Sequence, residues 1–405
     1  MKRILIALTF LVSLSSLAQD TASIMYYNIL NFPSGDVTRA DTMKTIFQYA
    51  DPDLLLVNEL ESLFGSNLIL NNALNVDGVT KYAAATFYNG TDTDNQLFYN
   101  SDKIGLIEQF QIATNLRDIS EYHVYYKEPG MSSVSDTIDF WVYSCHLKAG
   151  STDANEDLRE IEAQQFKSYL DNAGRSGNLI LGGDFNFYNG NDVACQEILN
   201  GGNIPLYDPI NLIGNWNNNS IYANLHTQST RSSSGNAGGS GGGMDDRFDI
   251  IFATDEVIQG SDRVTFVPGS YESFGQDGNH FNSNINGGTN AAVPANIADA
   301  LFYNSDHLPV WMKLAFDEPL SIQHNEILID NFRLLNEQQL IEVTLSDLNQ
   351  NISAHLFNIS GQLITEQDFE NTNTIQMELG NLPAGAYVLQ LTTETSRSSV
   401  KLVID

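Results

Sequence analysis

Carboxylate, amide and imidazole side chains recur where apolar runs of this 405-residue chain begin or end. Burying a lone carboxylate or imidazole beside such runs is costly unless the group is paired or bound to a cation. The ends of neighbouring strands can converge on one mouth of a sheet, where pockets form. The pattern therefore predicts a shared site for acid–base or cation chemistry, built from Asn28, Glu59, His146, Asp184, Asp306 and His307.

Each of these residues also has a plain structural interpretation. Glu59 can be a solvated strand end, and an isolated histidine such as His146 is more often a hydrogen-bonded structural residue than a catalyst. Asp184 and Asn186 also fit an Asx-rich turn. Three histidines without a nearby carboxylate motif are interpreted as structural: His123, His226 and His280. It is the combination that favours a functional site.

Short apolar runs alternate with amphipathic segments over the first three quarters of the chain. Apolar residues at helical spacing predict one helix that stops at Asp51-Pro52 and another over residues 156–172. Strands are expected over residues 23–30, 54–57, 96–99, 123–126, 137–147, 178–182, 247–252 and 308–316. Strands that are apolar on both faces and separated by helices predict an α/β fold with sheets covered on both sides.

Two segments are predicted to be long loops. Ser232–Gly243 is rich in glycine and serine and is expected to be a flexible surface insertion. It lacks the Lys-Ser/Thr that would follow in a phosphate-binding P-loop. Asp277–Asn296 is rich in asparagine and glycine, and it fits either the rim of a site or surface filler.

The amino terminus has the pattern of a secretory signal peptide. Lys2 and Arg3 precede the apolar run Ile4–Val12, and Ser16-Leu17-Ala18 offers a small-x-small cleavage site. We therefore predict a signal peptide over residues 1–18 and a mature start near Gln19. The apolar run is too short for a permanent membrane helix, and no stable membrane span is expected.

The chain carries a formal net charge of −31, from 50 acidic and 19 basic residues. Proteins that hold nucleic acid through its phosphates usually present a basic stripe, whereas lysine and arginine are scattered singly here. Affinity for phosphate would have to come from a bound cation or from a few local groups. With two cysteines there is no disulfide framework, and Cys145 is expected to be a buried free thiol because it lies in an apolar run.

Several of the candidate residues lie in motifs that resemble the endonuclease/exonuclease/phosphatase superfamily. In chain order the motifs are Tyr27-Asn28-Ile29, Asn58-Glu59, Cys145-His146-Leu147, Gly183-Asp184-Phe185-Asn186, Arg247-Phe248-Asp249 and Ser305-Asp306-His307-Leu308-Pro309-Val310. The resemblance covers residues 20–316 and implies a deoxyribonuclease-I-like catalytic domain, a four-layer α/β/β/α sandwich. Asn58-Glu59 stands where Gln-Glu is commoner, and the Asn95-Gln96 region lacks an obvious acid to support His146.

The resemblance implies a metal-assisted attack of water on a phosphodiester. Glu59 would ligate a divalent cation, with Asn28 and Asp306 completing or orienting its shell. Mg²⁺ suits carboxylate and amide oxygens, and Mn²⁺ or Ca²⁺ would be alternatives. The cation would polarise the phosphoryl oxygen and screen an anionic substrate from an acidic protein.

The remaining roles implied by the resemblance are catalytic. Asp249 would fix the tautomer of His307, which would act as general base or orient the attacking water. Asp184 and Asn186 would position that water and stabilise the transition state. His146 would donate a hydrogen bond or a proton to a phosphate oxygen. Whether His307 or Asp184 is the base stays open.

A second, smaller domain is expected after a change of composition at Asp317-Glu318-Pro319. Short alternating strands with regular turn signals predict a small all-β sandwich. Ile359-Ser360-Gly361, Leu382-Pro383-Ala384-Gly385 and Ser399–Val403 resemble the type A sorting domain of the type IX secretion system, over residues 325–405. The resemblance implies recognition by that secretion machinery. The alternative is an ordinary β-sandwich for adhesion or carbohydrate binding.

Together these features predict a monomeric phosphoesterase exported through periplasm and outer membrane to the medium or cell surface. The favoured activity is that of an extracellular nuclease or related phosphodiesterase. One alternative is a phosphodiesterase or phosphatase acting on lipid headgroups or small phosphate esters. The absence of a basic groove for nucleic acid supports this alternative. Another is a surface binding protein that has lost catalysis, against which the intact set of carboxylates and histidines argues.

Overall fold

The computed structural model describes residues 20–34, 36–127, 137–234, 238–316, 329–335, 340–345, 350–358, 362–380, 382–393 and 397–404. The predicted signal peptide therefore lies outside the described residues. The chain divides into two compact units, with the division between Glu318 and Pro319. In the described part of the chain, no helix combines the length and the apolar character needed to cross a bilayer.

The first sheet of the larger unit has β1 (Thr21–Phe32) near its centre. Its strands run in the order β10-β12-β1-β2-β4-β3, with the short β11 also on β12. The bounds of these neighbours are β2 Leu54–Leu60, β3 Tyr82–Ala84, β4 Asp94–Asn100, β10 Val264–Phe266, β11 Glu272–Ser273 and β12 Val310–Phe316. Strand β12 pairs antiparallel with β1 and sets Ala315 opposite Thr21, so the two ends of the larger unit meet in one strand pair.

The second sheet has the order β5-β6-β7-β8-β9. Its strands are β5 Ile104–Ile112, β6 Ile119–Tyr126, β7 Ile138–His146, β8 Leu179–Asp184 and β9 Asp249–Ala253. Strands β7 and β8 are parallel, with His146 opposite Asp184, and β9 runs antiparallel to β8 with Asp249 opposite Asp184. Strand register alone thus brings three of the predicted site residues to one edge of the sheet.

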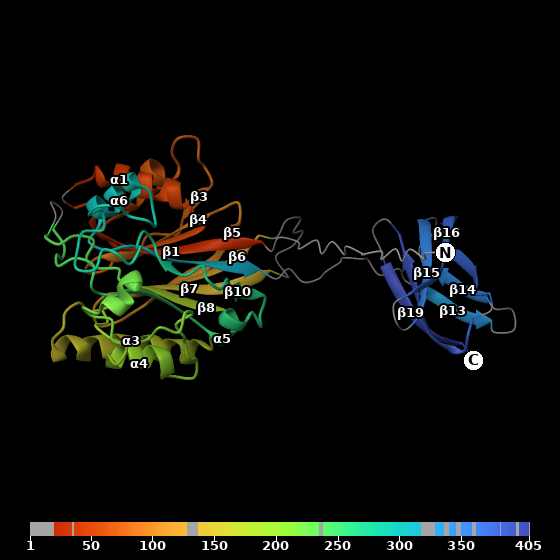
Figure 1. The fold of residues 1–405 in the computed structure, drawn as a ribbon. Helices are drawn as coiled ribbons and strands as arrows, with labels where there is room; N and C mark the ends of the chain where they lie inside the picture. Colours follow the sequence, from red (N-terminus) through yellow and green to blue (C-terminus); the bar gives the residue numbers. More distant parts are fainter. Residues whose placement is uncertain are drawn as a thin grey trace, which may run out of the picture. The chain divides into compact units, whose positions relative to one another are not determined.

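The two sheets stack face to face between two helical layers (Figure 1). Tyr26 and Leu56 of the first sheet pack against Val142 and Ile180 of the second in a fully buried core. The outer face of the first sheet is covered by α1 (Arg39–Ala50), α2 (Leu63–Leu68), a π-helix (Ile69–Leu74) and α6 (Ala295–Asn304). The second sheet is covered by α3 (Asp153–Ala173) and α4 (Val193–Asn200). The predicted four-layer α/β/β/α sandwich is confirmed.

The smaller unit consists of two antiparallel sheets around a core of its own. Their orders are β13-β14-β17 and β16-β15-β18-β19. The strands are β13 Ile329–Leu335, β14 Leu340–Leu345, β15 Gln350–Asn358, β16 Leu363–Thr372, β17 Thr374–Glu378, β18 Gly385–Thr392 and β19 Arg397–Ile404. Buried residues alternate along β14 and β18, as expected for strands with one inward face, and Val343, Leu356 and Leu389 meet in the core. The predicted small β-sandwich is confirmed.

Candidate active site

Glu59 and Asn28 join the first sheet to the second. The Asn28 amide nitrogen donates hydrogen bonds to Glu59 Oε1 at 2.9 Å and to Asp184 Oδ2 at 3.0 Å. Glu59 has a left-handed backbone, with φ of 61°, and its Oε2 accepts from the backbone N–H of Asn31 at 3.0 Å. The buried guanidinium of Arg39 shapes that segment by binding the carbonyls of residues 29 and 30. One amide therefore bridges two carboxylates that come from different sheets.

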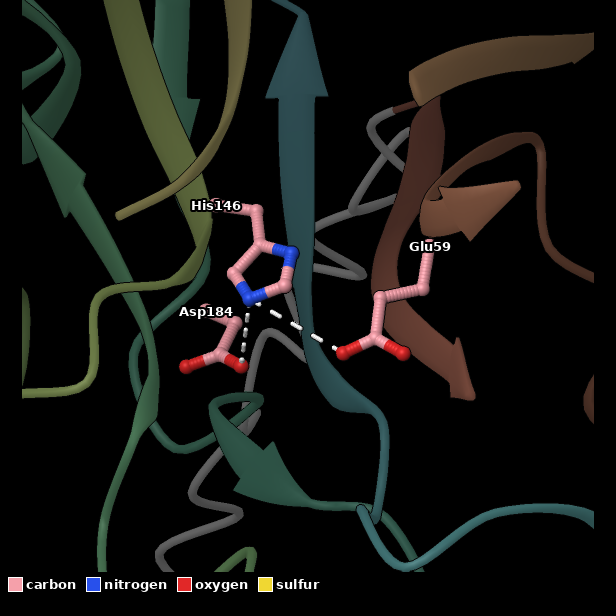
Figure 2. A group of neighbouring side chains, drawn as sticks. All are labelled: Glu59, His146 and Asp184. Carbon is pink, nitrogen blue, oxygen red and sulfur yellow. Dashed lines mark ion pairs between the residues drawn. The ribbon is translucent and has the colours of Figure 1, made fainter. Parts of the chain in front are cut away.

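His146 and Asp184 end the parallel strands β7 and β8. Figure 2 shows the His146 ring between the two carboxylates, with Nε2 3.6 Å from Asp184 Oδ2 and 3.8 Å from Glu59 Oε1. Gly183, just before Asp184, has a φ of 137°, and a Cβ on it would lie 2.0 Å from the Cys145 carbonyl oxygen. Glycine is therefore required where β8 delivers its carboxylate.

Asp249 and His307 form a buried dyad on the other side of Asp184. His307 Nδ1 lies 2.7 Å from Asp249 Oδ2, and its Nε2 lies 3.6 Å from Asp184 Oδ2. The Ser305 hydroxyl accepts the backbone N–H of His307 and donates to the Asn28 carbonyl at 2.6 Å. The Ser-Asp-His triplet thus uses its serine to attach the histidine to strand β1.

Asn186 takes up the Asx-turn geometry that was the structural alternative for this pair. Its backbone N–H donates to Asp184 Oδ1 at 3.0 Å, and its side-chain amide donates to the Leu147 carbonyl at 3.2 Å. These bonds leave the other oxygen of Asp184, Oδ2, facing Asn28 and the two histidines. The Asx turn therefore positions Asp184 in the candidate site, and the structural and functional interpretations of the pair are compatible.

Asp306 is buried under the glycine- and serine-rich segment. Its Oδ2 accepts the Ser240 backbone N–H at 2.6 Å, and a Cβ on Gly239 would lie 2.8 Å from its carboxyl group. Among the described residues, its Oδ1 has no hydrogen-bond partner. This segment, expected to be a flexible surface insertion, contacts a candidate site residue through Gly239 and Ser240.

Burial and charge give the ionisable groups different protonation preferences. Burial raises the pKa of Glu59, and it raises that of Asp184 to about 7 although the nearby His307 opposes the shift. Burial lowers the pKa of His146 well below its ordinary value, so a neutral imidazole is favoured there. Burial also opposes charge on His307, but Asp249 and Asp184 outweigh it and raise the pKa of that histidine well above its ordinary value. Both shifts favour the protonated form, and the two groups face each other, so the titrations of Asp184 and His307 are coupled.

The same geometry suits a divalent cation. Ligand atoms of Glu59, His146 and Asp184 all lie within 4.8 Å of one another. The carboxylates are hard oxygen donors of the kind that Mg²⁺ prefers, and a cation among them would relieve their mutual repulsion. The unpartnered Oδ1 of Asp306 is a further buried acceptor in the described part of the chain, and the Asp306 charge contributes to the raised pKa of Glu59.

Sequence reasoning missed two residues that hold the dyad. The Thr227 hydroxyl accepts the backbone N–H of Asp249 at 3.0 Å, and the Thr227 carbonyl accepts that of Leu308 at 2.7 Å. The Gln228 amide lies 2.6 Å from His307 Nε2. Both residues lie in an irregular segment without apolar periodicity, so no strand-end signal marks them.

The family to which the sequence belongs supports the class of phosphoester hydrolase. The sequence matches the model described as "Endonuclease/Exonuclease/phosphatase family" over residues 25–307, and the chain belongs to that family. Residues 337–405 match the "Secretion system C-terminal sorting domain", which indicates export to the medium or the cell surface by type IX secretion. A search of curated protein sequences finds no match.

Several solved structures have a similar fold. D. rerio TDP2 in complex with a single-strand DNA product shares 14% identity, covering 73% of this chain and 98% of that one, with a TM-score of 0.48. The human Nocturnin catalytic domain with bound sulfate shares 15%, covering 74% and 98%, with a TM-score of 0.46. An endonuclease/exonuclease/phosphatase from Bacteroides vulgatus shares 14%, covering 74% and 100%, with a TM-score of 0.47.

Proposed function

We propose that the larger unit is a secreted, divalent-metal-dependent phosphodiesterase, with nucleic acid as its first candidate substrate. The observation that carries the proposal is the placement of Asp184. Its Oδ2 lies 3.0 Å from the Asn28 amide nitrogen and 3.6 Å from the reactive nitrogens of both His146 and His307. One carboxylate oxygen thus faces an amide donor and two imidazoles, one of which is a candidate base.

In the proposed reaction, water attacks phosphorus and the bond from phosphorus to the leaving oxygen breaks. Glu59, with Asn28 and Asp306 beside it, would hold Mg²⁺, which would supply Lewis-acid polarisation of the phosphoryl group. The pair formed by Asp184 and His307 takes the proton of the attacking water. The leaving oxygen takes a proton from bulk water, to which the pair then releases its own. The products are a phosphate monoester and an alcohol.

Each histidine has a separate task in this proposal. Asp249 holds His307 through Nδ1, so that Nε2 is the atom that faces the reacting groups. His146 is buried and favours the neutral form, so it acts as a hydrogen-bond donor to a phosphate oxygen. Asn186 orients the carboxylate of Asp184 through its backbone N–H.

A second candidate substrate class is small or lipid-borne phosphate esters. A groove of about 530 Å³ begins at Asn31, next to Glu59, and Glu61 and Asp92 are among its lining residues. Carboxylates along a groove repel the phosphates of a long polyanion more than they repel a single phosphate ester. This observation is what supports compact phosphate esters as the second candidate beside nucleic acid.

A substrate panel tests the proposal and separates the candidates. Plasmid DNA, RNA, sphingomyelin vesicles and bis(p-nitrophenyl) phosphate would be assayed with Mg²⁺ and with EDTA. Asp184→Asn and His307→Ala are expected to abolish hydrolysis, whereas His123→Ala on β6 removes an imidazole outside the site and is expected to retain it. Turnover that survives EDTA or both site variants would show that the mechanism is wrong.

A further inference from the structure

The reactive nitrogen of His307 is already occupied by a side chain of the protein. The Gln228 side-chain amide lies 2.6 Å from His307 Nε2, while Nδ1 is engaged by Asp249 at 2.7 Å. Asp184 Oδ2 lies further from Nε2, at 3.6 Å. Gln228 is therefore the closest polar contact that the structure records for the atom assigned to face substrate.

The backbone of Gln228 is fixed from two sides. Its N–H donates to the Asp246 carbonyl at 3.0 Å, and its carbonyl accepts the backbone N–H groups of Asp245 and Asp246, both at 2.9 Å. The same residue forms bridges with His307 and with Asp246. The side chain is only partly buried. Rotation about its side-chain bonds is therefore the direct way for the amide to leave His307.

An imidazole nitrogen has a single hydrogen-bonding direction, filled either by one N–H or by one lone pair. A water molecule or phosphate oxygen cannot bond to Nε2 while the Gln228 amide does. The amide offers a donor at one end and an acceptor at the other, so it can match a neutral or a protonated ring. The contact therefore persists in either protonation state until another group displaces it.

We propose that Gln228 is a positioning residue that holds His307 in the substrate-free enzyme and is displaced from Nε2 when the phosphate group of the substrate and the attacking water enter the site. The inference rests on the proposed function, because that function requires Nε2 to face the reacting groups. Binding of substrate then includes the loss of one amide–imidazole hydrogen bond. The backbone contacts of Gln228 keep the amide close enough to return after product leaves.

Two substitutions at this position are expected to change KM in opposite directions. Gln228→Ala removes the contact that substrate must break, and it is expected to lower KM for bis(p-nitrophenyl) phosphate by about 3- to 10-fold with little change in kcat. Gln228→Glu offers a carboxylate to the ring, a stronger partner, and is expected to raise KM. Gln109→Ala on strand β5 removes an amide of the same size and is expected to change neither constant.

Binding of inorganic phosphate, measured by calorimetry, tests displacement without turnover. Gln228→Ala is expected to bind phosphate more tightly than the wild type. If the wild type hydrolyses the ester but the variant has unchanged KM and phosphate affinity, the role of Gln228 is wrong and the proposed function stands. A fall in kcat of tenfold or more at constant KM overturns it too, because the amide would then act in the reacting complex. If the wild type hydrolyses no phosphodiester, the proposed function fails, and tighter phosphate binding by the variant still supports displacement.

Discussion

A buried ion pair two residues before Asp249 supports the site and allows a quantitative test. The Arg247 guanidinium, 1% exposed, donates to both oxygens of Asp208 at 3.0 and 3.1 Å. Its other contacts are the Leu212 carbonyl at 3.2 Å and the Tyr271 hydroxyl at 3.1 Å. We predict that Asp208→Asn strongly destabilises the larger unit.

The magnitude follows from what the substitution leaves behind. Asparagine keeps the shape of Asp208 but removes its charge and turns an NH₂ group toward the guanidinium donors. Arg247 cannot lose its proton, so a buried cation remains without a counter-charge. Breaking one side of a buried pair costs about 3–5 kcal/mol. At roughly 2–3 °C per kcal/mol for a large domain, the melting temperature is expected to fall by about 6–15 °C.

Thermal unfolding at neutral pH, followed by circular dichroism, measures the effect. The matched control is Asp77→Asn, which breaks the Lys44–Asp77 pair at 2.8 Å on the surface. Asn tolerates the left-handed backbone of Asp77, so the control changes charge without adding strain. Its melting temperature is expected to stay close to that of the wild type.

Two results would refute this reasoning. A melting temperature for Asp208→Asn within about 2 °C of the wild type would mean that the pair contributes little. Equal losses in Asp208→Asn and in the Asp77→Asn control would mean that net charge, rather than burial, sets the effect. Added salt is expected to leave the difference in place, because buried charges are poorly screened.

Three further predictions concern the site and pH. Asp249→Asn is expected to lower kcat by about 10²- to 10⁴-fold with a much smaller change in KM, because His307 loses the carboxylate that fixes its tautomer; steady-state kinetics showing less than a tenfold loss would contradict this. Mg²⁺ at about 100 times its Kd is expected to stabilise the wild type by about 2.7 kcal/mol and the Glu59→Gln variant much less. If Mg²⁺ raised the melting temperatures of both proteins equally, Glu59 would be excluded as a ligand. Burial raises the pKa of Glu162 from 4.5 to about 7, so its stabilising protonated form is present below about pH 4.5 and is lost as pH rises through 7. The free energy of unfolding of Glu162→Gln is therefore expected to exceed that of the wild type by about 1–3 kcal/mol at pH 8.5 and to equal it at pH 4.5. Urea unfolding at the two pH values measures this difference, and Glu160→Gln controls for the lost charge. Equal gains at both pH values would contradict the burial argument.

The central strands could be predicted because burial on both faces leaves a continuous apolar run. Strands β1, β2, β7 and β8 all contain such a run. Strands β7 and β8 end at polar residues, and in β1 and β2 the apolar run is followed by Asn28 and by Asn58-Glu59. Once β7 and β8 are parallel neighbours, register places His146 beside Asp184. The strand-end pattern therefore carried both the fold class and the grouping of most candidate residues, whose roles remain predictions.

Elements with mixed polarity could not be predicted in the same way. Strand β5 lies at the edge of its sheet, and the exposed Glu108 and the partly buried Gln109 interrupt its apolar pattern. Helix α6 starts directly after Pro294, at the end of a segment whose composition indicates a loop. Gln228 meets His307 across 79 positions of sequence, through an irregular segment with no local signal. Such contacts depend on tertiary structure alone.

The pairing of Thr21 with Ala315 determines where the larger unit can be fused to another protein or attached to a surface. The polypeptide enters and leaves the unit at neighbouring points, so a linker of a few residues could close it into a ring and new termini could be opened in a surface loop. Asn28 lies seven residue steps beyond Thr21 along extended β1, a span of about 23 Å. A tag, carrier or surface anchor fused next to Thr21 or Ala315 therefore begins well away from the carboxylates that would act on substrate. Immobilising the enzyme through those two positions should leave the candidate active site accessible to substrate.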